Sequence, residues 1–230
     1  MPPRDPLAAH APASAFYNVM GGLFGEDVYL AEAVPALVDD QLFPAEREYI
    51  RGAVPKRRAE FGTARVCARR ALVALGADPI PLVPGADRAP TWPSGVVGSI
   101  SHTDGYCVAA VTRSPPARSI GLDVETLRVL DPSLAEIVLT PRERAWLRDR
   151  PASSRSELGL LCFSAKEAFY KCQYRVTGTF LDFLDVEIQV AQAQGRFDVR
   201  VLEPGWRPNG ASGSGRFAFE GNRVMCGILW

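Results

Sequence analysis

Lysine is scarce in this chain, which has 23 arginines but only three lysines, Lys56, Lys166 and Lys171. Two of these lie five residues apart, and a lysine kept against such a bias indicates a position that prefers a compact ammonium to a planar guanidinium. Neither sign of charge is in excess, because 26 basic residues balance 26 acidic ones. This balance argues against a protein that binds nucleic acid through its overall charge, and we expect no nucleic-acid partner.

Long apolar runs are also lacking. No stretch approaches the roughly 20 apolar residues that span a bilayer, and the N-terminal segment has no apolar region typical of a secretion signal. The five cysteines are an odd number without a C-x-x-C pair, which is typical of reduced thiols packed as small apolar groups. With 47% hydrophobic and 23% charged residues, the composition predicts a soluble cytoplasmic protein with no membrane partner.

The order of the predicted elements indicates an α+β fold rather than regular β-α alternation. A helix is predicted from Lys56 to Leu75, because apolar residues recur every three or four positions between Pro55 and Gly76. No close internal repeat is apparent, and Gly210–Gly215 is predicted to be a turn. The other predicted elements are strands at 96–101, 106–112 and 118–125, helices within 131–150 and at 164–174, and strands at 183–190, 197–202, 217–219 and 224–229.

Two carboxylates are predicted to share one face of the strand at 118–125. Residues two apart on a strand point to the same side, so Asp123 and Glu125 project together while Val124 faces a core. Gly121, on the carboxylate face, would let a ligand approach closely. Such a pair suits Mg²⁺, which takes one or two carboxylates together with water and phosphate oxygens. The alternative at this point is a solvated strand face, on which Asp-x-Glu is common.

The segment Phe163-Ser-Ala-Lys-Glu-Ala-Phe-Tyr-Lys171 allows two interpretations. Ser164 followed three residues later by Glu167 is the pattern of a helix capping box, and Glu167 with Lys171 is a favourable i,i+4 pair. Both features could serve only to start a helix. The functional interpretation is that this helix presents a carboxylate and an ammonium together to a phosphorylated ligand.

Groups that could bind an anion occur in two further places. His102, one of two histidines, ends the stretch Gly98-Ser-Ile-Ser-His102 at a strand terminus, where ligand-binding groups are frequent. The helix that starts at Lys56 carries six basic residues against the single acid Glu60 between positions 56 and 70. Each feature alone is compatible with a solvated surface. Combined with the carboxylates and lysines, they predict a ligand that has a diphosphate and a separate phosphate.

Three motifs, in this order along the chain, resemble those of the phosphopantetheinyl transferase superfamily: Gly98-Ser-Ile-Ser-His102, Ile120-Gly-Leu-Asp-Val-Glu125 and the segment 163–171. The helix beginning Lys56-Arg-Arg-Ala-Glu-Phe61 is similar to the corresponding segment in the branch of the superfamily that serves siderophore, nonribosomal-peptide and polyketide synthases. The similarity is greatest to the actinobacterial members of this branch. The resemblance implies a magnesium-dependent enzyme that transfers the 4′-phosphopantetheine arm of coenzyme A to a serine of apo acyl or peptidyl carrier proteins. The second product would be adenosine 3′,5′-bisphosphate.

The resemblance also implies the fold. We expect two similar α+β halves with pseudo-twofold symmetry, comprising residues 1–118 and 119–230, with coenzyme A bound between them. A hinge would lie near Pro115–Ser119, where proline and small residues concentrate. Two fused halves predict a monomer.

The roles of the site residues follow from the same resemblance. Asp123, Glu125 and Glu167 would surround the magnesium ion, and Glu167, directly or through water, would accept the proton of the carrier serine. The predicted catalytic residues are Glu167, Lys171, Asp123 and His102. The predicted contacts to coenzyme A come from basic and hydroxyl side chains: Arg57, Arg65, Arg88, Ser101, His102, Lys166 and Lys171. Ser101 is expected to contact the 3′-phosphate.

The carrier protein is expected to dock on residues 127–147, which follow the predicted metal strand and contain several apolar side chains. These are Leu130, Leu134, Ile137, Val138 and Leu139. The alternative function is a non-catalytic module that binds coenzyme A or a carrier protein. Such a module would be expected to have lost a metal carboxylate or the glutamate–lysine pair, and this chain retains them. A different phosphotransferase is not indicated, because the sequence has no G-x-x-x-x-G-K-[ST] loop.

Overall fold

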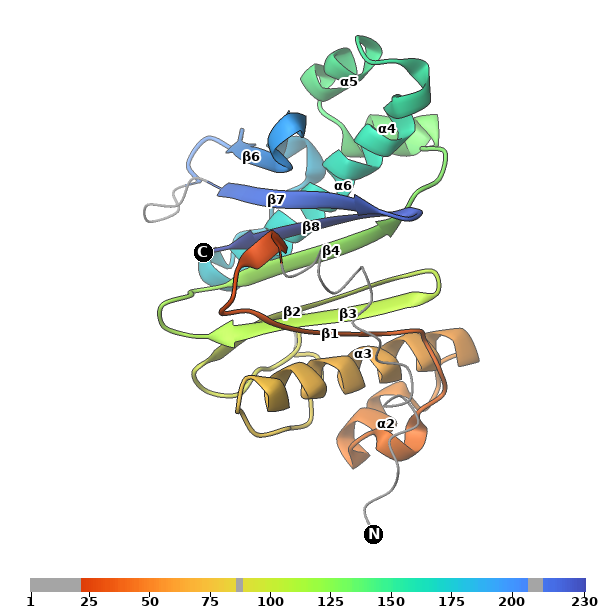
Figure 1. Cartoon of the computed structure of the whole chain (residues 1–230), viewed down its shortest axis with the longest axis vertical. Coiled ribbons are helices and arrows are strands. Elements are labelled where there is room, and N and C mark those ends of the chain that lie inside the picture. The colour runs from red at the N-terminus through yellow and green to blue at the C-terminus, as the bar shows by residue number, and fades with distance from the viewer. Residues whose placement is uncertain (1–21, 86–88, 207–212) are drawn as a thin grey trace.

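The computed structural model describes residues 22–85, 89–206 and 213–230, which form two antiparallel sheets, each covered by a long helix (Figure 1). The first sheet has the strand order β1-β3-β2, and helix α3 packs on β3 and β1. The elements of this N-terminal half are β1 (Tyr29–Ala33), η2 (Asp39–Gln41), α2 (Pro44–Ile50), α3 (Pro55–Ala74), β2 (Val96–Thr103) and β3 (Tyr106–Arg113).

The second sheet has the strand order β4-β8-β7-β6-β5, and helix α6 packs on β4 and β8. The elements of this C-terminal half are β4 (Ile120–Thr126), α4 (Pro132–Val138), α5 (Pro141–Arg148), α6 (Ala152–Thr177), η3 (Phe183–Asp185), β5 (Val186–Ala191), η4 (Gln192–Gln194), β6 (Arg196–Val201), β7 (Gly213–Glu220) and β8 (Arg223–Leu229). None of the helices in the described ranges combines the length and apolar character that crossing a membrane requires.

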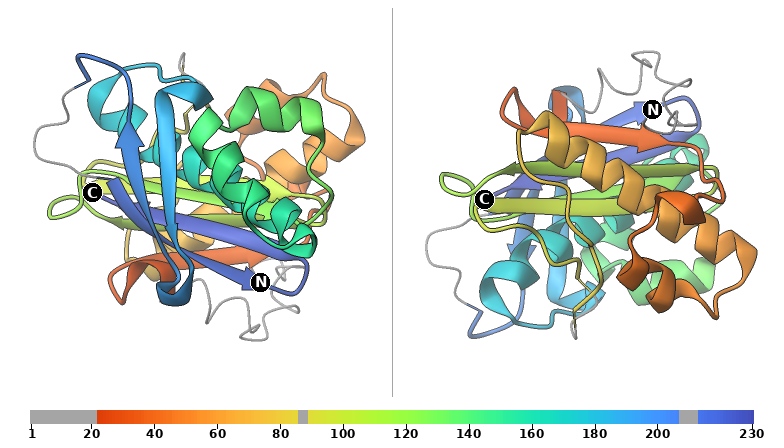
Figure 2. Two further views of the ribbon diagram at one scale, coloured as in Figure 1. Left: turned by 90° about the horizontal axis from the view of Figure 1, so that it is seen from above. Right: turned by 90° about the horizontal axis from the view of Figure 1, so that it is seen from below.

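The two sheets pack through their inner faces, and the long helices lie on the outer faces (Figure 2). Leu30 and Val108 from the first sheet share an apolar cluster with Leu122 and Met225 from the second. Along one edge β2 lies beside β4, although the two strands belong to different sheets. Each half has a first strand, a short helix, a long helix and a final hairpin in the same order, which confirms the predicted α+β fold of two similar halves.

Most predicted elements are confirmed. The helix expected at 56–75 is α3, the three strands that follow are β2, β3 and β4, and residues 131–150 contain α4 and α5. Strand β1 and helix α2 were not predicted. The turn expected at Gly210–Gly215 lies partly outside the described residues, and its last three residues belong to β7.

The predicted start of the third helix is wrong. Helix α6 begins at Ala152, so Ser164 lies in the middle of the helix and is fully buried. The Ser-x-x-Glu pattern therefore does not form a capping box here. Helix α6 instead ends at the left-handed Gly178, whose positive φ only glycine adopts without strain.

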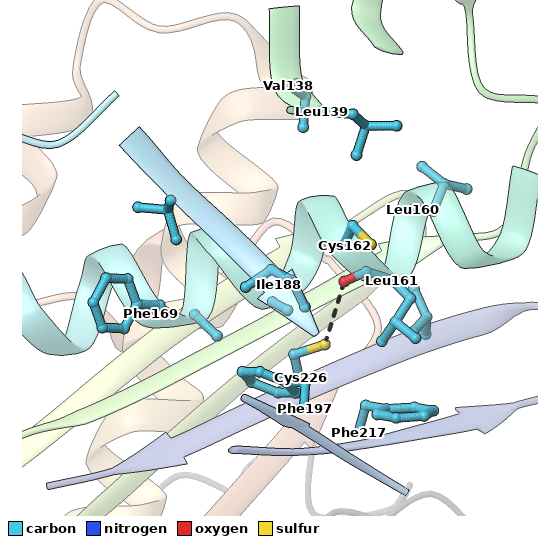
Figure 3. Close-up of a cluster of buried hydrophobic side chains, with 14 of the residues drawn as sticks. Val138, Leu139, Leu160, Leu161, Cys162, Phe169, Ile188, Phe197, Phe217 and Cys226 are labelled. Carbon is cyan, nitrogen blue, oxygen red and sulfur yellow. Dashed lines mark hydrogen bonds between the residues drawn. The ribbon is translucent and has the colours of Figure 1, made fainter. Parts of the chain in front are cut away.

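Helix α6 is buried because its apolar residues form the centre of the C-terminal core. Leu160, Leu161 and Phe169 of this helix belong to one buried cluster with Val138 and Leu139 from the end of α4, and Figure 3 shows Val138 and Leu139 on the side of α6 near Leu160. Val138 and Leu139 are each 1% exposed. The expectation that these two residues are available to a carrier protein is therefore wrong, because they are needed to anchor α4 to α6.

An internal repeat joins the short helix to the long helix in each half. Helices α2 and α5 begin with similar sequences, Leu42-Phe-Pro-Ala-Glu-Arg47 and Leu139-Thr-Pro-Arg-Glu-Arg144. In both, the glutamate bonds the backbone N–H three residues earlier. It also forms a buried ion pair with a cation 23 residues later on the long helix, Glu46 with Arg69 and Glu143 with Lys166. The expectation of no close repeat is therefore corrected at these positions.

Candidate active site

Strand β4 presents its carboxylates toward helix α6, as alternation along the strand predicts. Leu122 and Val124 are buried in the cluster between the sheets, so Asp123 points to the opposite side. Gly121 lies on the same side as Asp123, but a Cβ atom at this position would lie 1.8 Å from the carbonyl oxygen of Ala168. Gly121 therefore allows α6 to approach the strand closely, and the prediction that it makes room for a ligand is wrong.

Lys171 holds the buried carboxylate of Asp123. Its ammonium nitrogen lies 2.7 Å from Asp123 Oδ1 and 3.1 Å from the carbonyl oxygen of Leu122. The hydroxyl of Ser101, which comes from β2 in the other half, donates to the same Oδ1 at 2.9 Å. One carboxylate oxygen thus connects residues from three elements and both halves of the molecule.

Burial and the negative charge of Asp123 raise the pKa values of two glutamates of the site. Burial raises the pKa of Glu125 to about 7, and the negative charge of Asp123 adds to this shift. Burial also raises the pKa of Glu167, again with a contribution from Asp123, while Lys171 acts in the opposite direction. Clustered carboxylates with raised pKa values are typical of functional sites.

The protein itself supplies only part of the ligand set of a magnesium ion. No group of three or more histidine, cysteine, aspartate or glutamate side chains is close enough to hold a metal in the part of the chain that the structure describes. Asp123 Oδ2, however, is buried and has no hydrogen-bond partner among the described residues. A buried carboxylate oxygen without a partner is costly. Because Mg²⁺ uses one or two carboxylates and completes its shell with water and phosphate oxygens, this donor set fits the ion.

His102 and Arg57 lie together at the end of β2. Arg57 Nη1 is 3.2 Å from His102 Nε2, and Glu60 lies 3.9 Å from the other ring nitrogen. Burial lowers the pKa of His102, and the cations Arg57 and Lys171 lower it further, against the opposing effect of Glu60. The exposed Arg57 gives the site a positive end on the N-terminal half, beside the half-buried imidazole of His102.

A groove of about 1040 Å³ lies between the two halves and includes Glu167 and Lys171 in its wall. One wall is formed by β2 and the segment before it, with the indole of Trp92, and the other by the second part of α6. Tyr170 and Tyr174, which stack on each other with ring centroids 5.3 Å apart, line the α6 side. These aromatic residues were not predicted as part of the site, although the i,i+4 spacing of the two tyrosines marks one helix face.

The other predicted contacts to coenzyme A have different surroundings. Arg65 is largely buried, stacks on Phe61 and donates from Nε to the carbonyl oxygen of Leu82, and burial lowers its pKa to about 10. Arg88 lies outside the described residues. The hydroxyl of Ser101 is buried against Asp123, as described above.

Lys166 points away from the carboxylate cluster. Its ammonium group donates to Glu143 Oε2 at 2.7 Å and to the carbonyl oxygens of Val138 and Phe183 at 2.8 and 2.9 Å. These three acceptors match the three N–H donors of a lysine. The prediction that Lys166 contacts coenzyme A is therefore corrected, because this side chain holds α4, α5 and η3 to α6.

Two family models match the chain over most of the described residues. The 4′-phosphopantetheinyl transferase N-terminal domain matches residues 45–112, and the 4′-phosphopantetheinyl transferase superfamily matches residues 119–209. The 4′-phosphopantetheinyl transferase Npt of Nocardia iowensis is 39% identical over 202 residues, which cover 85% of this chain and 89% of the relative. The chain belongs to the 4′-phosphopantetheinyl transferase superfamily.

Two further relatives of this superfamily show how widely the similarity extends. The 4′-phosphopantetheinyl transferase Svp of Streptomyces mobaraensis is 46% identical over 166 residues, covering 71% of this chain and 67% of that protein. Enterobactin synthase component D of Escherichia coli K12 is 32% identical over 164 residues, covering 69% and 77%. The predicted membership in the actinobacterial branch is thus confirmed by the relatives from Nocardia and Streptomyces.

Proposed function

We propose that this phosphopantetheinyl transferase moves the 4′-phosphopantetheine arm of coenzyme A to a serine hydroxyl of apo acyl or peptidyl carrier proteins. The observation that carries the proposal is that Glu167 and Lys171 line a groove between the two halves, where Lys171 binds Asp123 and both charges act on the pKa of Glu167. A groove of about 1040 Å³ has room for a ligand of the size of coenzyme A. Its polar end combines carboxylates with cations, which suits a diphosphate bound together with a metal ion.

The reacting groups have separate roles. Glu167, with its pKa raised by burial and by Asp123, is suited to accept the proton of the carrier serine. The serine oxygen then forms a bond to the β-phosphorus of coenzyme A, and the bond from that phosphorus to the bridging oxygen breaks. Adenosine 3′,5′-bisphosphate leaves with the bonding pair. Lys171 can stabilise the charge that develops on the phosphoryl oxygens.

Asp123, Glu125 and Glu167 are the residues that would hold magnesium, and Asp123 Oδ2 is a buried oxygen without a hydrogen-bond partner in the described part of the chain. The ion, when bound, supplies a Lewis acid that polarises the phosphoryl oxygens. Arg57 and His102 are placed to contact the phosphates at the N-terminal side of the site. Arg65 and Arg88 remain predicted contacts to the nucleotide end.

The carrier protein is proposed to dock on residues 127–147, which connect the carboxylate strand to α5. Val129 and Ile137 are the exposed apolar side chains of this segment, at 83% and 61% exposure. We expect Val129→Asp and Ile137→Asp to raise KM for the carrier protein by about tenfold and to leave coenzyme A binding unchanged. Val34→Asp, at a similarly exposed apolar residue of the N-terminal half, is the matched control. A loss of coenzyme A affinity in the first two variants would contradict this docking site.

Three finer properties belong to the same proposal. We place the division between the halves after residue 118, because the chain leaves β3 at Arg113 and enters β4 at Ile120. We expect a monomer, because both halves of the groove come from one chain. A reducing cytoplasmic setting agrees with five free, buried cysteines.

The test is transfer of the arm to a purified apo carrier protein with coenzyme A and Mg²⁺, detected by mass spectrometry of the carrier. Wild-type protein is expected to add one arm per carrier, and Glu167→Gln is expected to lose the reaction. Glu157→Gln removes an exposed carboxylate on the same helix outside the groove and serves as the control. Coenzyme A binding without transfer to any carrier type would instead favour the non-catalytic binding module.

A further inference from the structure

Three hydroxyl side chains of β2 bond the backbone of β4 at alternate positions. Ser99 Oγ accepts from Leu122 N at 3.0 Å, and Ser101 Oγ accepts from Val124 N at 3.3 Å. Thr103 Oγ1 accepts from Thr126 N at 3.1 Å. Side chains thus satisfy the N–H groups on this edge of β4, and the two halves are joined by hydroxyls of one strand.

The middle hydroxyl differs from its neighbours because it also bonds a carboxylate. Ser101 Oγ donates to Asp123 Oδ1 at 2.9 Å and lies 3.3 Å from the ammonium of Lys171. Ser99 instead donates to the carbonyl oxygen of Leu122, at 3.5 Å. Both serines are 5% exposed, so they are matched in burial but not in their partners.

The hydroxyl of Ser101 has no capacity left for a ligand. A serine hydroxyl offers one donor and two acceptor lone pairs. Here the donor faces Asp123, and the acceptor side faces Val124 N and Lys171 Nζ. Contact with the 3′-phosphate would break the bond to Asp123, so the structure does not favour that predicted role for the Ser101 side chain.

We propose that Ser101, a residue of the N-terminal half, is a positioning residue for the metal-binding carboxylate of the C-terminal half. Together with Lys171 it fixes Oδ1 of Asp123 and leaves Oδ2, which is buried and unpartnered among the described residues, as the oxygen that would bind a divalent cation. Without the hydroxyl, the carboxylate can rotate about its terminal bond, whose torsion is broad. Partners that orient a metal ligand typically change metal affinity 10- to 100-fold.

The inference rests on the metal site of the proposed function, so its test measures metal binding directly. Mn²⁺ is titrated into the full-length protein with saturating coenzyme A, and free Mn²⁺ is followed by electron paramagnetic resonance. Coenzyme A affinity without metal is measured by calorimetry, and the melting temperature of every variant is recorded. We expect Ser101→Ala to bind Mn²⁺ about 10- to 100-fold more weakly than wild type, with metal-free coenzyme A affinity changed less than about twofold.

Two variants separate positioning from general destabilisation. Ser99→Ala loses the equivalent backbone bond at equal burial, so it should lower the melting temperature to a similar extent and leave Mn²⁺ affinity unchanged. Ser101→Thr keeps the hydroxyl, as Thr103 does two positions further along the strand, and should restore Mn²⁺ affinity. In transfer assays, Ser101→Ala should need more Mg²⁺ for half-maximal rate and recover most of kcat at saturating Mg²⁺.

Four results would overturn the inference. An Mn²⁺ affinity of Ser101→Ala equal to that of the wild type would exclude a positioning role. An equal loss of Mn²⁺ affinity in Ser99→Ala would assign the effect to the hydrogen bonds that join β2 to β4. A loss of metal-free coenzyme A affinity in Ser101→Ala assigns the hydroxyl to the ligand. If wild-type protein with coenzyme A binds no Mn²⁺ at all, the metal site of the proposed function fails as well, which distinguishes the two failures.

Discussion

The two halves have equivalent frameworks but unequal chemistry. Tyr106 and Arg223 each begin the second strand of a hairpin whose turn has two residues, so they occupy equivalent positions in the two halves. Two residues further along, Val108 pairs with Glu32 and Met225 pairs with Val124, which makes Glu32 equivalent to Val124. The residues on either side of this equivalent pair therefore also correspond: Ala31 of β1 to Asp123 of β4, and Ala33 to Glu125. The repeated ion pairs likewise align Arg69 with Lys166, so Arg70 corresponds to Glu167.

The comparison shows that folding contacts recur in both halves while the reactive groups occur in one. Each half keeps a buried glutamate at the start of its short helix and a cation on its long helix. The carboxylates that would hold a metal occur only in the C-terminal half. The N-terminal half contributes different groups to the same site, namely Ser101, His102 and Arg57. The site is therefore asymmetric although the framework is repeated.

The largest expected effect concerns the reactive positions themselves. Glu167→Gln should lower kcat for transfer by about 10²–10⁴-fold, because it removes the proton acceptor without changing shape. Arg70→Gln, at the equivalent position of α3, should change kcat less than about threefold. Initial rates at saturating coenzyme A and carrier protein measure both. Equal losses in the two variants would mean that the N-terminal half takes part in the chemistry.

The next effect concerns the repeated ion pairs. Glu46→Gln and Glu143→Gln should each lower the free energy of unfolding by about 3–5 kcal/mol, because each leaves a buried cation without its partner. Glu143→Gln should cost more, since the Lys166 side chain is 1% exposed whereas that of Arg69 is 11% exposed. Urea unfolding followed by circular dichroism measures the difference. A larger loss in Glu46→Gln would reverse the predicted order of the two pairs.

A smaller effect concerns the packing of the long helices on their first strands. Gly121→Ala should destabilise the fold by about 3 kcal/mol, because the new methyl group meets the carbonyl oxygen of Ala168. Tyr29 occupies the equivalent position of β1 and is 37% exposed, so Tyr29→Ala should cost less than about 1 kcal/mol. Thermal and urea unfolding of both variants test this. A neutral Gly121→Ala variant would mean that α6 can move away from β4 at little cost.

The smallest effect is the pH dependence that Glu125 contributes in the C-terminal half. The folded-state pKa of Glu125, about 7, lies above the ordinary value of 4.5, so the metal-free folded protein binds the extra proton between these pH values. Stability should therefore fall as pH rises from 4.5 to 7, by on the order of 2 kcal/mol. This free-energy change is smaller than the full pKa shift of Glu125 implies, because the Glu125 side chain is 18% exposed and solvent screens its charge.

Glu125→Gln should weaken this pH dependence, because the amide does not ionise whereas Glu167, whose pKa burial also raises, still titrates. Urea unfolding of the metal-free wild type and variant at pH 5, 6, 7 and 8 makes the comparison. The equivalent Ala33 cannot titrate, so Ala33→Gly provides a variant in which the pH dependence should persist. A wild-type stability that falls no more steeply with pH than that of Glu125→Gln would contradict the raised pKa of Glu125.

Local patterns in the sequence were sufficient for helix α3, the strands β2 to β4 and the shared direction of Asp123 and Glu125. These features depend on periodicity within a few residues, with 3.6 residues per turn in a helix and two per repeat in a strand. The three motifs also indicated the superfamily, because their residue types and order suffice for that comparison. What they could not show was which of the named side chains meet.

Tertiary structure decided how three motif residues are used. Ser164 matched a capping box, but α6 extends through it because the surrounding apolar residues are buried by both the sheet and α4. Lys166 neighbours Glu167 in sequence, yet adjacent residues on a helix point about 100° apart. The direction of Lys166 is set by the buried Glu143 together with two backbone carbonyl oxygens. Gly121 was interpreted as space for a ligand, but α6 fills that space.

The sequence by itself therefore determined the fold class, the superfamily and the face on which the carboxylates lie. Only the tertiary structure decided that Ser101 and Lys171 meet at Asp123, because these two residues lie 22 and 48 positions away from Asp123 along the chain. It also decided that the two buried glutamates have the same role in both halves. The physical reason is that periodicity is local, whereas the partner of a buried polar group depends on which distant segments pack against it.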